Sequence, residues 1–172
     1  ASSPNSGEFI VENSVFTENS GNTIDLSGPK LGSSVKRSIF ASNGYVGFGS
    51  NGFASSNAGS PNSFTIDSSV FNDNNKSNLD TACGASCGAA GVKLNNMTGY
   101  TVKNSVFENT NARSGGLWCD IDCSNAVMIN NISRNNGGFG IFYEISSKGI
   151  IASNLIYDNR TAGIQVFASH TK

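Results

Sequence analysis

The sequence predicts an all-β fold, a parallel β-solenoid in which about six coils build three sheets. Three observations predict it: a short apolar unit recurs along the chain, Gly and Asn separate its copies, and only 13% of the residues are charged. Helical repeats would need longer amphipathic runs, which this density of Asn and Gly would break. At 172 residues the chain is long enough for one domain and short for two, so residues 1–172 are treated as a single solenoid domain.

The recurring unit has the form Asn-Ser-Val-Phe or a close variant of it. The aliphatic residue of each unit is interpreted as its anchor, although either member of a Val-Phe pair could face inward. Successive anchors are separated by 24, 31, 36, 26 and 24 residues, which a basic coil of about 24 residues with two longer coils explains. The anchors are Val15, Ile39, Val70, Val106, Ile132 and Ile156.

Each unit lies between two further extended stretches. One precedes it, as in Phe9-Ile10-Val11, and a Gly-led stretch follows it, as in Gly140-Ile141-Phe142. The order strand, bend, strand, glycine turn, strand describes one turn of a three-sheet coil. Stacking coils at about 4.8 Å pairs each strand with the equivalent strand of the next coil.

Asparagine recurs just after the anchors. Asn tolerates the left-handed conformation and can hydrogen-bond to its equivalents in a stack, so these residues are predicted to be turn residues that form a ladder. They are Asn19, Asn43, Asn109, Asn135 and Asn159.

The two longer coils carry predicted loop excursions, around residues 44–63 and 72–91. The first is rich in Gly, Ser and Asn, with Tyr45, Phe48 and Phe53 as its large side chains. Functional loops project from solenoids in this way, although a tolerated insertion explains the pattern equally well.

The pattern Asn-x-[Ile/Val]-x-x-Asn followed by Gly-Ile resembles the repeat of the pectate-lyase-like solenoids, which include secreted polysaccharide lyases, glycoside hydrolases and phage tailspikes. The resemblance covers the chain from Phe9 to Ser169. Together with the handedness rule for parallel connections, it implies a right-handed parallel β-helix. It implies no particular activity, because this fold hosts many functions.

The net charge and the hydropathy of the chain indicate which binding partners are excluded. A net charge of −1 provides no attraction for nucleic acid or an anionic membrane, and no apolar run approaches the roughly 18 residues of a membrane span. The chain opens at Ala1 without Met, as a processed polypeptide would. The single histidine and the Ser/Asn-rich composition favour an extracellular chain. Neither a nucleic-acid partner nor a membrane span is expected.

Four cysteines form two C-x3-C pairs, Cys83/Cys87 and Cys119/Cys123. This spacing differs from the C-x2-C of zinc ribbons, and an extracellular chain favours disulfides. We therefore predict disulfides, with buried free thiols and a zinc site as alternatives. Four cysteines allow three pairings, and the sequence leaves all three open.

The segment Gly116–Cys123 gathers most of the residue types that perform chemistry. Period-2 alternation places Leu117, Cys119 and Ile121 on the inner face. The same alternation places the other three side chains on the outer face: Trp118, Asp120 and Asp122.

Neighbouring coils add to this outer face. In the next coil, Phe142 and Glu144 are predicted to stack over Trp118 and Asp120. In the preceding coil, Lys93 and Asn95 are predicted to lie below the same two residues.

Three interpretations of this face remain open. As an enzyme, it would use the carboxyl groups of Asp120, Asp122 and Glu144. Those of Asp120 and Glu144 are about one coil apart, near the 5–5.5 Å of retaining glycosidases. A lyase would instead hold Ca²⁺ with the acids and use Lys93 as the base. As a glycan-binding surface, it would stack Trp118 and Phe142 on sugar rings beside Lys93, while the acids and Asn95 accept hydrogen bonds from hydroxyl groups. As a structural surface, it would only keep the sheet soluble or meet another subunit. No cofactor or resident metal is assigned to this face, and Ca²⁺ is the cation kept as an alternative there.

Solenoid ends expose unpaired strand edges, which invite association unless a cap covers them. No amphipathic capping helix is visible in residues 1–8. The sequence therefore predicts a secreted, non-catalytic module that stacks end to end into a filament, matrix or appendage and contacts glycans through the Trp118 face. The alternative is a polysaccharide-active enzyme, either a glycoside hydrolase or a lyase.

Overall fold

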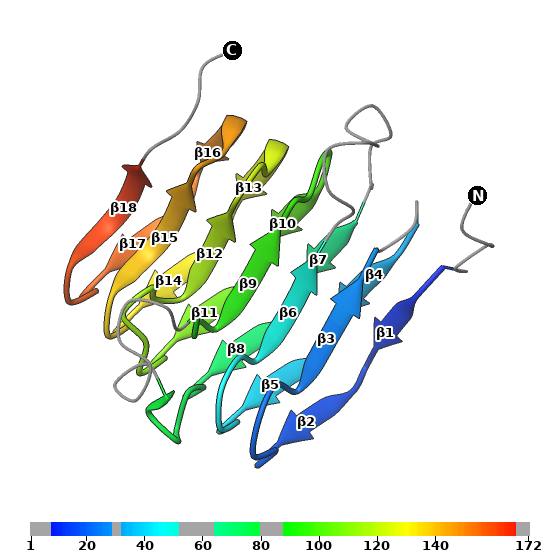
Figure 1. Ribbon diagram of the computed structural model, residues 1–172, viewed down its shortest axis with the longest axis vertical. Coiled ribbons are helices and arrows are strands. Elements are labelled where there is room, and N and C mark those ends of the chain that lie inside the picture. Colours follow the sequence, from blue (N-terminus) through cyan, green and yellow to red (C-terminus); the bar gives the residue numbers. More distant parts are fainter. Residues whose placement is uncertain (1–7, 29–31, 52–63, 80–87, 168–172) are drawn as a thin grey trace.

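The computed structural model describes residues 8–28, 32–51, 64–79 and 88–167. In this part of the chain, 18 short strands form three parallel sheets of six strands each (Figure 1). Sheet A is β1 (Ile10–Glu12), β4 (Ser34–Lys36), β7 (Thr65–Asp67), β10 (Thr101–Lys103), β13 (Ser124–Ile129) and β16 (Ser147–Ala152). Sheet B is β2 (Val15–Thr17), β5 (Ile39–Ala41), β8 (Val70–Asn72), β11 (Val106–Glu108), β14 (Ile132–Arg134) and β17 (Leu155–Tyr157). Sheet C is β3 (Ile24–Ser27), β6 (Phe48–Asn51), β9 (Val92–Asn95), β12 (Leu117–Asp120), β15 (Phe139–Glu144) and β18 (Ala162–Phe167).

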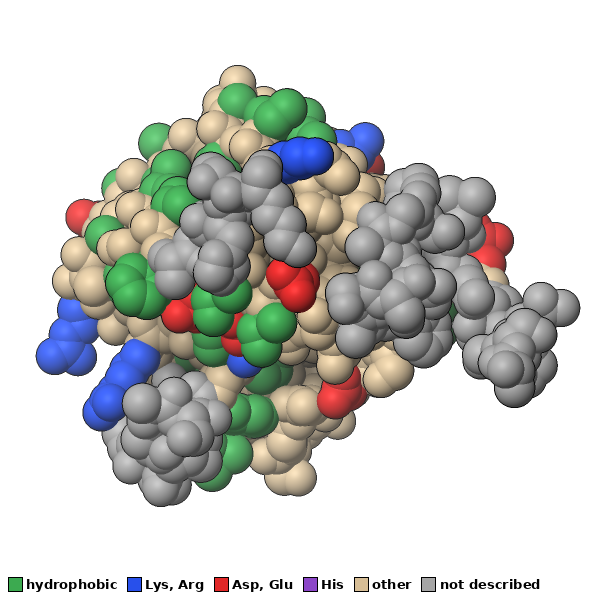
Figure 2. All heavy atoms as spheres, turned by 45° about the horizontal axis from the view of Figure 1, so that its top comes forward, with side chains coloured by type: hydrophobic (Ala, Val, Ile, Leu, Met, Phe, Trp, Pro, Cys, Tyr) green, Lys and Arg blue, Asp and Glu red, His purple; other side chains and the backbone are tan. Residues whose placement is uncertain are grey.

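Each coil contributes one strand to each sheet. Successive coils lie side by side from β1–β3 at one end of the stack to β16–β18 at the other (Figure 1). This confirms the predicted three-sheet solenoid of about six coils. On the face that Figure 2 shows, the described residues present mainly uncharged polar side chains and backbone, together with apolar side chains and few charged ones.

The first predicted excursion is shorter than the sequence suggested. Phe48 lies in β6 with none of its side chain exposed, so residues 48–51 belong to the coil itself. The part from 52 to 63, which includes Phe53, is outside the described residues, as are residues 80–87 of the second excursion.

In sheet B the aliphatic members of the Val-Phe pairs point outward, which resolves the orientation that the sequence left open. The strands of this sheet are three residues long and only the central position faces the core, so Phe40 is fully buried while Val15 and Ile39 are 65% and 42% exposed. The last anchor is also displaced by one residue, because Leu155, not Ile156, pairs with Ile132.

A ladder of phenylalanines fills the core behind sheet B. Phe16, Phe40, Phe71 and Phe107 stack with ring centroids 4.8, 4.9 and 5.2 Å apart. The 4.7–4.9 Å spacing between neighbouring strands sets this distance, so the parallel register forces equal side chains into face-to-face contact.

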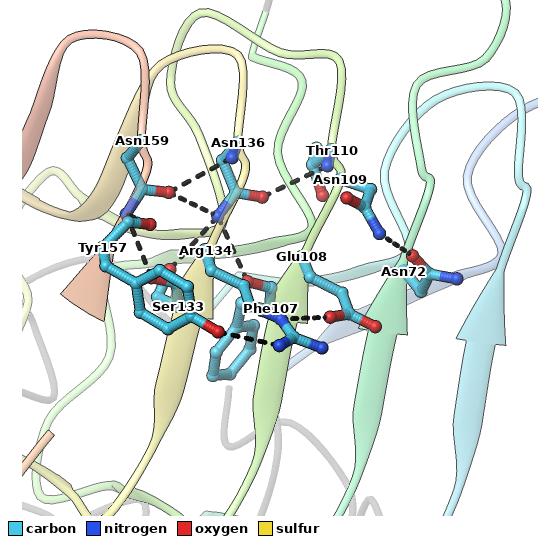
Figure 3. A network of polar contacts seen from close by, with 10 residues as sticks. All are labelled: Asn72, Phe107, Glu108, Asn109, Thr110, Ser133, Arg134, Asn136, Tyr157 and Asn159. Atoms are coloured by element: carbon cyan, nitrogen blue, oxygen red, sulfur yellow. Dashed lines mark hydrogen bonds and ion pairs between the residues drawn. The ribbon is translucent and has the colours of Figure 1, made fainter. Parts of the chain in front are cut away.

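A second ladder, of asparagines, lies where each coil turns from sheet B to sheet C. The Nδ2 amide donates to Oδ1 of the next coil from Asn19 to Asn43 and from Asn43 to Asn74, each over 2.9 Å. The same bond joins Asn136 to Asn159 over 2.9 Å, as Figure 3 shows. The prediction of such a ladder through Asn19, Asn43 and Asn159 is confirmed.

The other two predicted ladder residues are displaced by one position. Asn109 and Asn135 have φ of 54° and 53° and occupy the left-handed position just before the ladder. Their successors, Thr110 and Asn136, take the ladder positions: the amide N–H of Thr110 donates to Oδ1 of Asn136 over 3.1 Å (Figure 3). Asparagine suits both positions, so residue type alone could not separate them.

Thr110 interrupts the asparagine ladder, and its buried hydroxyl oxygen has no hydrogen-bond partner within the described part of the chain. A Cβ on Gly91 would lie 3.0 Å from that oxygen, much as one on Gly116 would lie 2.8 Å from Nδ2 of Asn136. Glycine therefore leaves room for an amide at both levels.

We expect Thr110→Asn to complete the ladder and raise the free energy of unfolding by about 1 kcal/mol, measured by urea denaturation. Thr110→Val is the control, because it removes the unpaired hydroxyl without supplying an amide. An equal gain from both variants would contradict the ladder as the cause.

Candidate functional site on the outer face of sheet C

The outer face of sheet C consists of two straight rows of side chains, because the strands are in parallel register. Row 1 is Asp25, Gly49, Lys93, Trp118, Phe142 and Gln165. Row 2 is Ser27, Asn51, Asn95, Asp120, Glu144 and Phe167. The predicted stacking of Phe142 over Trp118, with Lys93 below, is confirmed.

A compact polar network connects the two rows. Lys93 Nζ lies 3.2 Å from Oδ2 of Asp120 and 3.6 Å from the centroid of the Trp118 ring. Trp118 Nε1 donates to Oε2 of Glu144 over 3.1 Å. Each of these charged or polar groups therefore has a partner inside the network.

The two aromatic rings of the network are covered. Trp118 and Phe142 stack with centroids 5.8 Å apart and are 8% and 9% exposed, because they form a small apolar cluster with Ala90 and Phe139. Ala90 belongs to the segment that leads into β9. The predicted glycan-stacking rings thus point away from the solenoid core but offer little surface to a sugar.

The predicted alternation fails after Asp120. Strand β12 ends there, and Ile121 and Asp122 follow with φ of 50° and 55°. Ile121 is 46% exposed rather than inward-facing, and Asp122 lies in the turn instead of continuing row 2. Of the three predicted catalytic carboxylates, the structure therefore places only Asp120 and Glu144 in one row.

Both carboxylates of row 2 are followed by a strained residue. Ile121 and Ile145 are β-branched and have φ of 50° and 46°. Such a conformation costs about 1–2 kcal/mol for a β-branched residue. Strain of this kind concentrates at functional sites, so it adds weight to this end of sheet C as a site.

The environment of Glu144 changes its acidity. Burial raises its pKa above the ordinary value, and the neighbouring Asp120 carboxylate raises it further. The hydrogen bond from Trp118 and the charge of Lys93 act in the opposite direction without cancelling the rise. A carboxyl group with a raised pKa beside a second carboxylate is the pair that acid–base chemistry requires.

This shift makes stability depend on pH with a definite sign. The folded chain holds the Glu144 proton more tightly than the unfolded chain, so ionisation destabilises the fold once the pH rises above the unfolded-state pKa of about 4.3. We expect Glu144→Gln, which keeps an acceptor for Trp118, to be more stable than the wild type at pH 7 and equal to it at pH 3. Urea denaturation at both pH values measures this, and a difference of the same size at both would contradict it.

A hollow of about 240 Å³ opens beside this network, over β3, β6 and β9. Row 1 supplies Asp25 and Lys93 on either side of Gly49, and row 2 supplies Asn51 and Asn95. The missing side chain at Gly49 creates much of this space, since an added Cβ there would find only ordinary contacts, the nearest at 3.7 Å.

The hollow offers several groups to a ligand. Tyr45 lines it and is fixed by a hydrogen bond of 2.8 Å from the Gly88 amide to its hydroxyl. Oδ1 of Asn95 is a buried acceptor without a partner among the described residues. Carboxylate, ammonium, amide and aromatic groups thus meet at one place, as in sites for polyhydroxylated ligands.

Sequence reasoning found only part of this hollow. It singled out Lys93 and Asn95, which line it, but missed Asp25 and Gly49. Gly49 pairs with Lys93, and the chain between them contains the inserted parts of both long coils. The simple 24-residue repeat therefore does not reveal their contact. A glycine inside a strand pattern was the available signal.

The predicted disulfides are not present where the structure describes cysteines. Cys119 and Cys123 are free, buried thiols. Each has another partner: Cys119 Sγ contacts the Tyr100 hydroxyl, and the Cys123 thiol donates to the Leu94 carbonyl over 3.3 Å. Burial raises the pKa of Cys119 well above its ordinary value and keeps this thiol protonated. The other predicted pair, Cys83 and Cys87, lies outside the described residues.

Among the described residues, no group of three or more His, Cys, Asp or Glu side chains is arranged to hold a metal ion. Those residues also contain no helix with the length and apolar character needed to cross a membrane.

Comparison with known proteins agrees with the architecture. Neither curated proteins nor solved structures give a match to the sequence. The family model for the right-handed β-helix region matches residues 48–172, well over half of the chain. With its three parallel six-stranded sheets, the chain therefore belongs to the right-handed β-helix family.

Proposed function

We propose that the chain is a non-catalytic, extracellular β-solenoid module that binds a glycan in the hollow on sheet C. The observation that carries this proposal is the convergence of Lys93, Asn95 and Tyr45 around an open floor at Gly49. Sugar hydroxyls both donate and accept hydrogen bonds, so they match the ammonium and amide groups, and the Tyr45 ring provides a face for stacking.

The row 2 carboxylates support a binding role over a catalytic one. Lys93 neutralises Asp120, and Glu144 accepts the indole N–H of Trp118. The two aromatic rings between them are covered. A sugar positioned for acid–base attack would have to displace several of these contacts at once.

Filling the hollow tests the proposal. We expect Gly49→Val to abolish glycan binding while leaving the fold intact, because a β-branched residue suits a strand and a Cβ at this position meets nothing closer than 3.7 Å. Screening the wild type on an oligosaccharide array identifies the ligand class, and titration calorimetry of both proteins measures the loss. Gln165→Val, in row 1 on β18, is the matched control and should bind as the wild type does. Binding by Gly49→Val at wild-type affinity would place the ligand elsewhere.

End-to-end association is a second element of the proposal. Ile164 and Val166 occupy inward-facing positions of β18, yet they are 47% and 57% exposed because no further coil covers them in the described chain. The first coil of a second copy would cover them and pair with the strand edge. Mass measurement by light scattering over a range of concentrations tests this association, and a single monomeric mass throughout would contradict it.

The enzymatic alternative rests on one observation, the raised pKa of Glu144 beside Asp120. It predicts that the wild type cleaves glycans on the array and that Asp120→Asn and Glu144→Gln each abolish cleavage. Glycan binding without cleavage, unchanged in both variants, would remove it.

A further inference from the structure

On the outer face of sheet C, carboxylates outnumber ammonium groups. Three carboxylates of sheet C, those of Asp25, Asp120 and Glu144, lie on the outer rows with a single ammonium group, that of Lys93. The formal charge of this part of the face is therefore negative.

The one ammonium group of this face lines the hollow but is already paired on its β12 side. Lys93 Nζ is held between the Asp120 carboxylate and the face of the Trp118 ring, at 3.2 Å and 3.6 Å. Both contacts lie towards β12, on the opposite side of Lys93 from Gly49 in row 1. A ligand in the hollow meets a cation whose charge is largely satisfied.

The carboxylate of the hollow is not committed in this way. Asp25 is exposed and forms none of the ion pairs found within the described ranges. Oδ1 of Asn95 also lacks a donor, but it is buried and lies on β9, two strands away from Asp25 on β3. Within the described ranges, the charged group of the hollow without an ion pair is thus a carboxylate.

We infer that the ligand is a glycan with free amino groups, such as an oligomer of glucosamine. Its ammonium group supplies three hydrogen-bond donors and a positive charge, which match the Asp25 carboxylate. Uronates and sulfated sugars are repelled by the same field. This inference rests on the proposed function, because it names the ligand class of the same hollow.

Calorimetry with three ligand series of equal length tests the inference: glucosamine oligomers, N-acetylglucosamine oligomers and galacturonate oligomers, all at low salt with EDTA present. We expect the wild type to bind the glucosamine series five- to tenfold more tightly than the acetylated one, and the galacturonate series least. Asp25→Asn is expected to lose this preference while keeping its affinity for the acetylated series. Asp158→Asn makes the same charge change on an exposed residue outside sheet C and should leave the preference intact.

The outcomes separate the two proposals. Equal affinities for the glucosamine and acetylated series, unchanged in Asp25→Asn, would overturn the amino-sugar inference and leave glycan binding standing. Preference for galacturonate, or binding that appears only when Ca²⁺ replaces EDTA, would overturn it as well. Failure of every oligosaccharide to bind would overturn the proposed function itself.

Discussion

Phe71→Ala is expected to lower the free energy of unfolding by about 3–5 kcal/mol, the range for removing a buried aromatic side chain. Phe71 is fully buried and stacks on both sides, with ring centroids 4.9 Å from Phe40 and 5.2 Å from Phe107. The substitution therefore leaves a cavity in the middle of the phenylalanine ladder and removes two aromatic contacts. Urea denaturation followed by circular dichroism measures the loss.

Because Phe71 lies in a central coil, its removal is expected to affect the cooperativity of unfolding as well as the free energy of unfolding. Coils of a solenoid contact only their neighbours, so a defect in a central coil weakens the coupling between the two ends. The transition should broaden as well as shift. Val70→Ala, at the neighbouring outward position of the same strand, is the control and should cost less than about 1 kcal/mol. Phe71→Leu, which keeps most of the volume, should lie between the two; a loss below about 1 kcal/mol for Phe71→Ala would show that the ladder is not the core.

The architecture could be predicted because the sequence repeats once in each coil. A coil repeats both its residue types and its turn positions, so the spacing of six short units was enough to predict three parallel sheets. The same regularity gave the register around Trp118 correctly, since the neighbouring coil is close to the basic repeat length.

What the sequence left open or predicted wrongly depends on the conformation of single residues. Strands of three residues have one inward position, and a Val-Phe pair does not reveal which residue takes it; in β5, Phe40 does and Ile39 does not. Ile121 adopts a left-handed conformation that its β-branched side chain disfavours. The alternating pattern of the sequence therefore predicted that the strand continues through Ile121, although β12 ends at Asp120. The hollow itself brings Gly49 and Lys93 together across both inserted segments, and no local pattern carries that pairing.

The second large effect concerns the polar network beside the hollow. We expect Lys93→Met to lower the free energy of unfolding by about 2–3 kcal/mol at pH 7, somewhat below the 3–5 kcal/mol of fully buried ion pairs. The side chains of Lys93 and Asp120 are 19% and 10% exposed, so the carboxylate cannot simply regain its hydration when its partner is removed. The variant also loses the cation–π contact with Trp118 and leaves Asp120 and Glu144 facing each other without a cation.

Lys103→Met is the matched control, because its ion pair with Asp67 is 38% and 24% exposed and lies on sheet A. An exposed pair contributes at most about 1 kcal/mol, so this variant should be close to the wild type. The deficit of Lys93→Met should shrink as the pH falls and the carboxylates take up protons, whereas a loss due to packing alone would not depend on pH. Adding Asp120→Asn to Lys93→Met should restore part of the stability at pH 7, because it removes the charge that lacks a partner. A double variant no more stable than Lys93→Met would mean that the lysine acts through its methylene stem on Trp118 instead of through its charge.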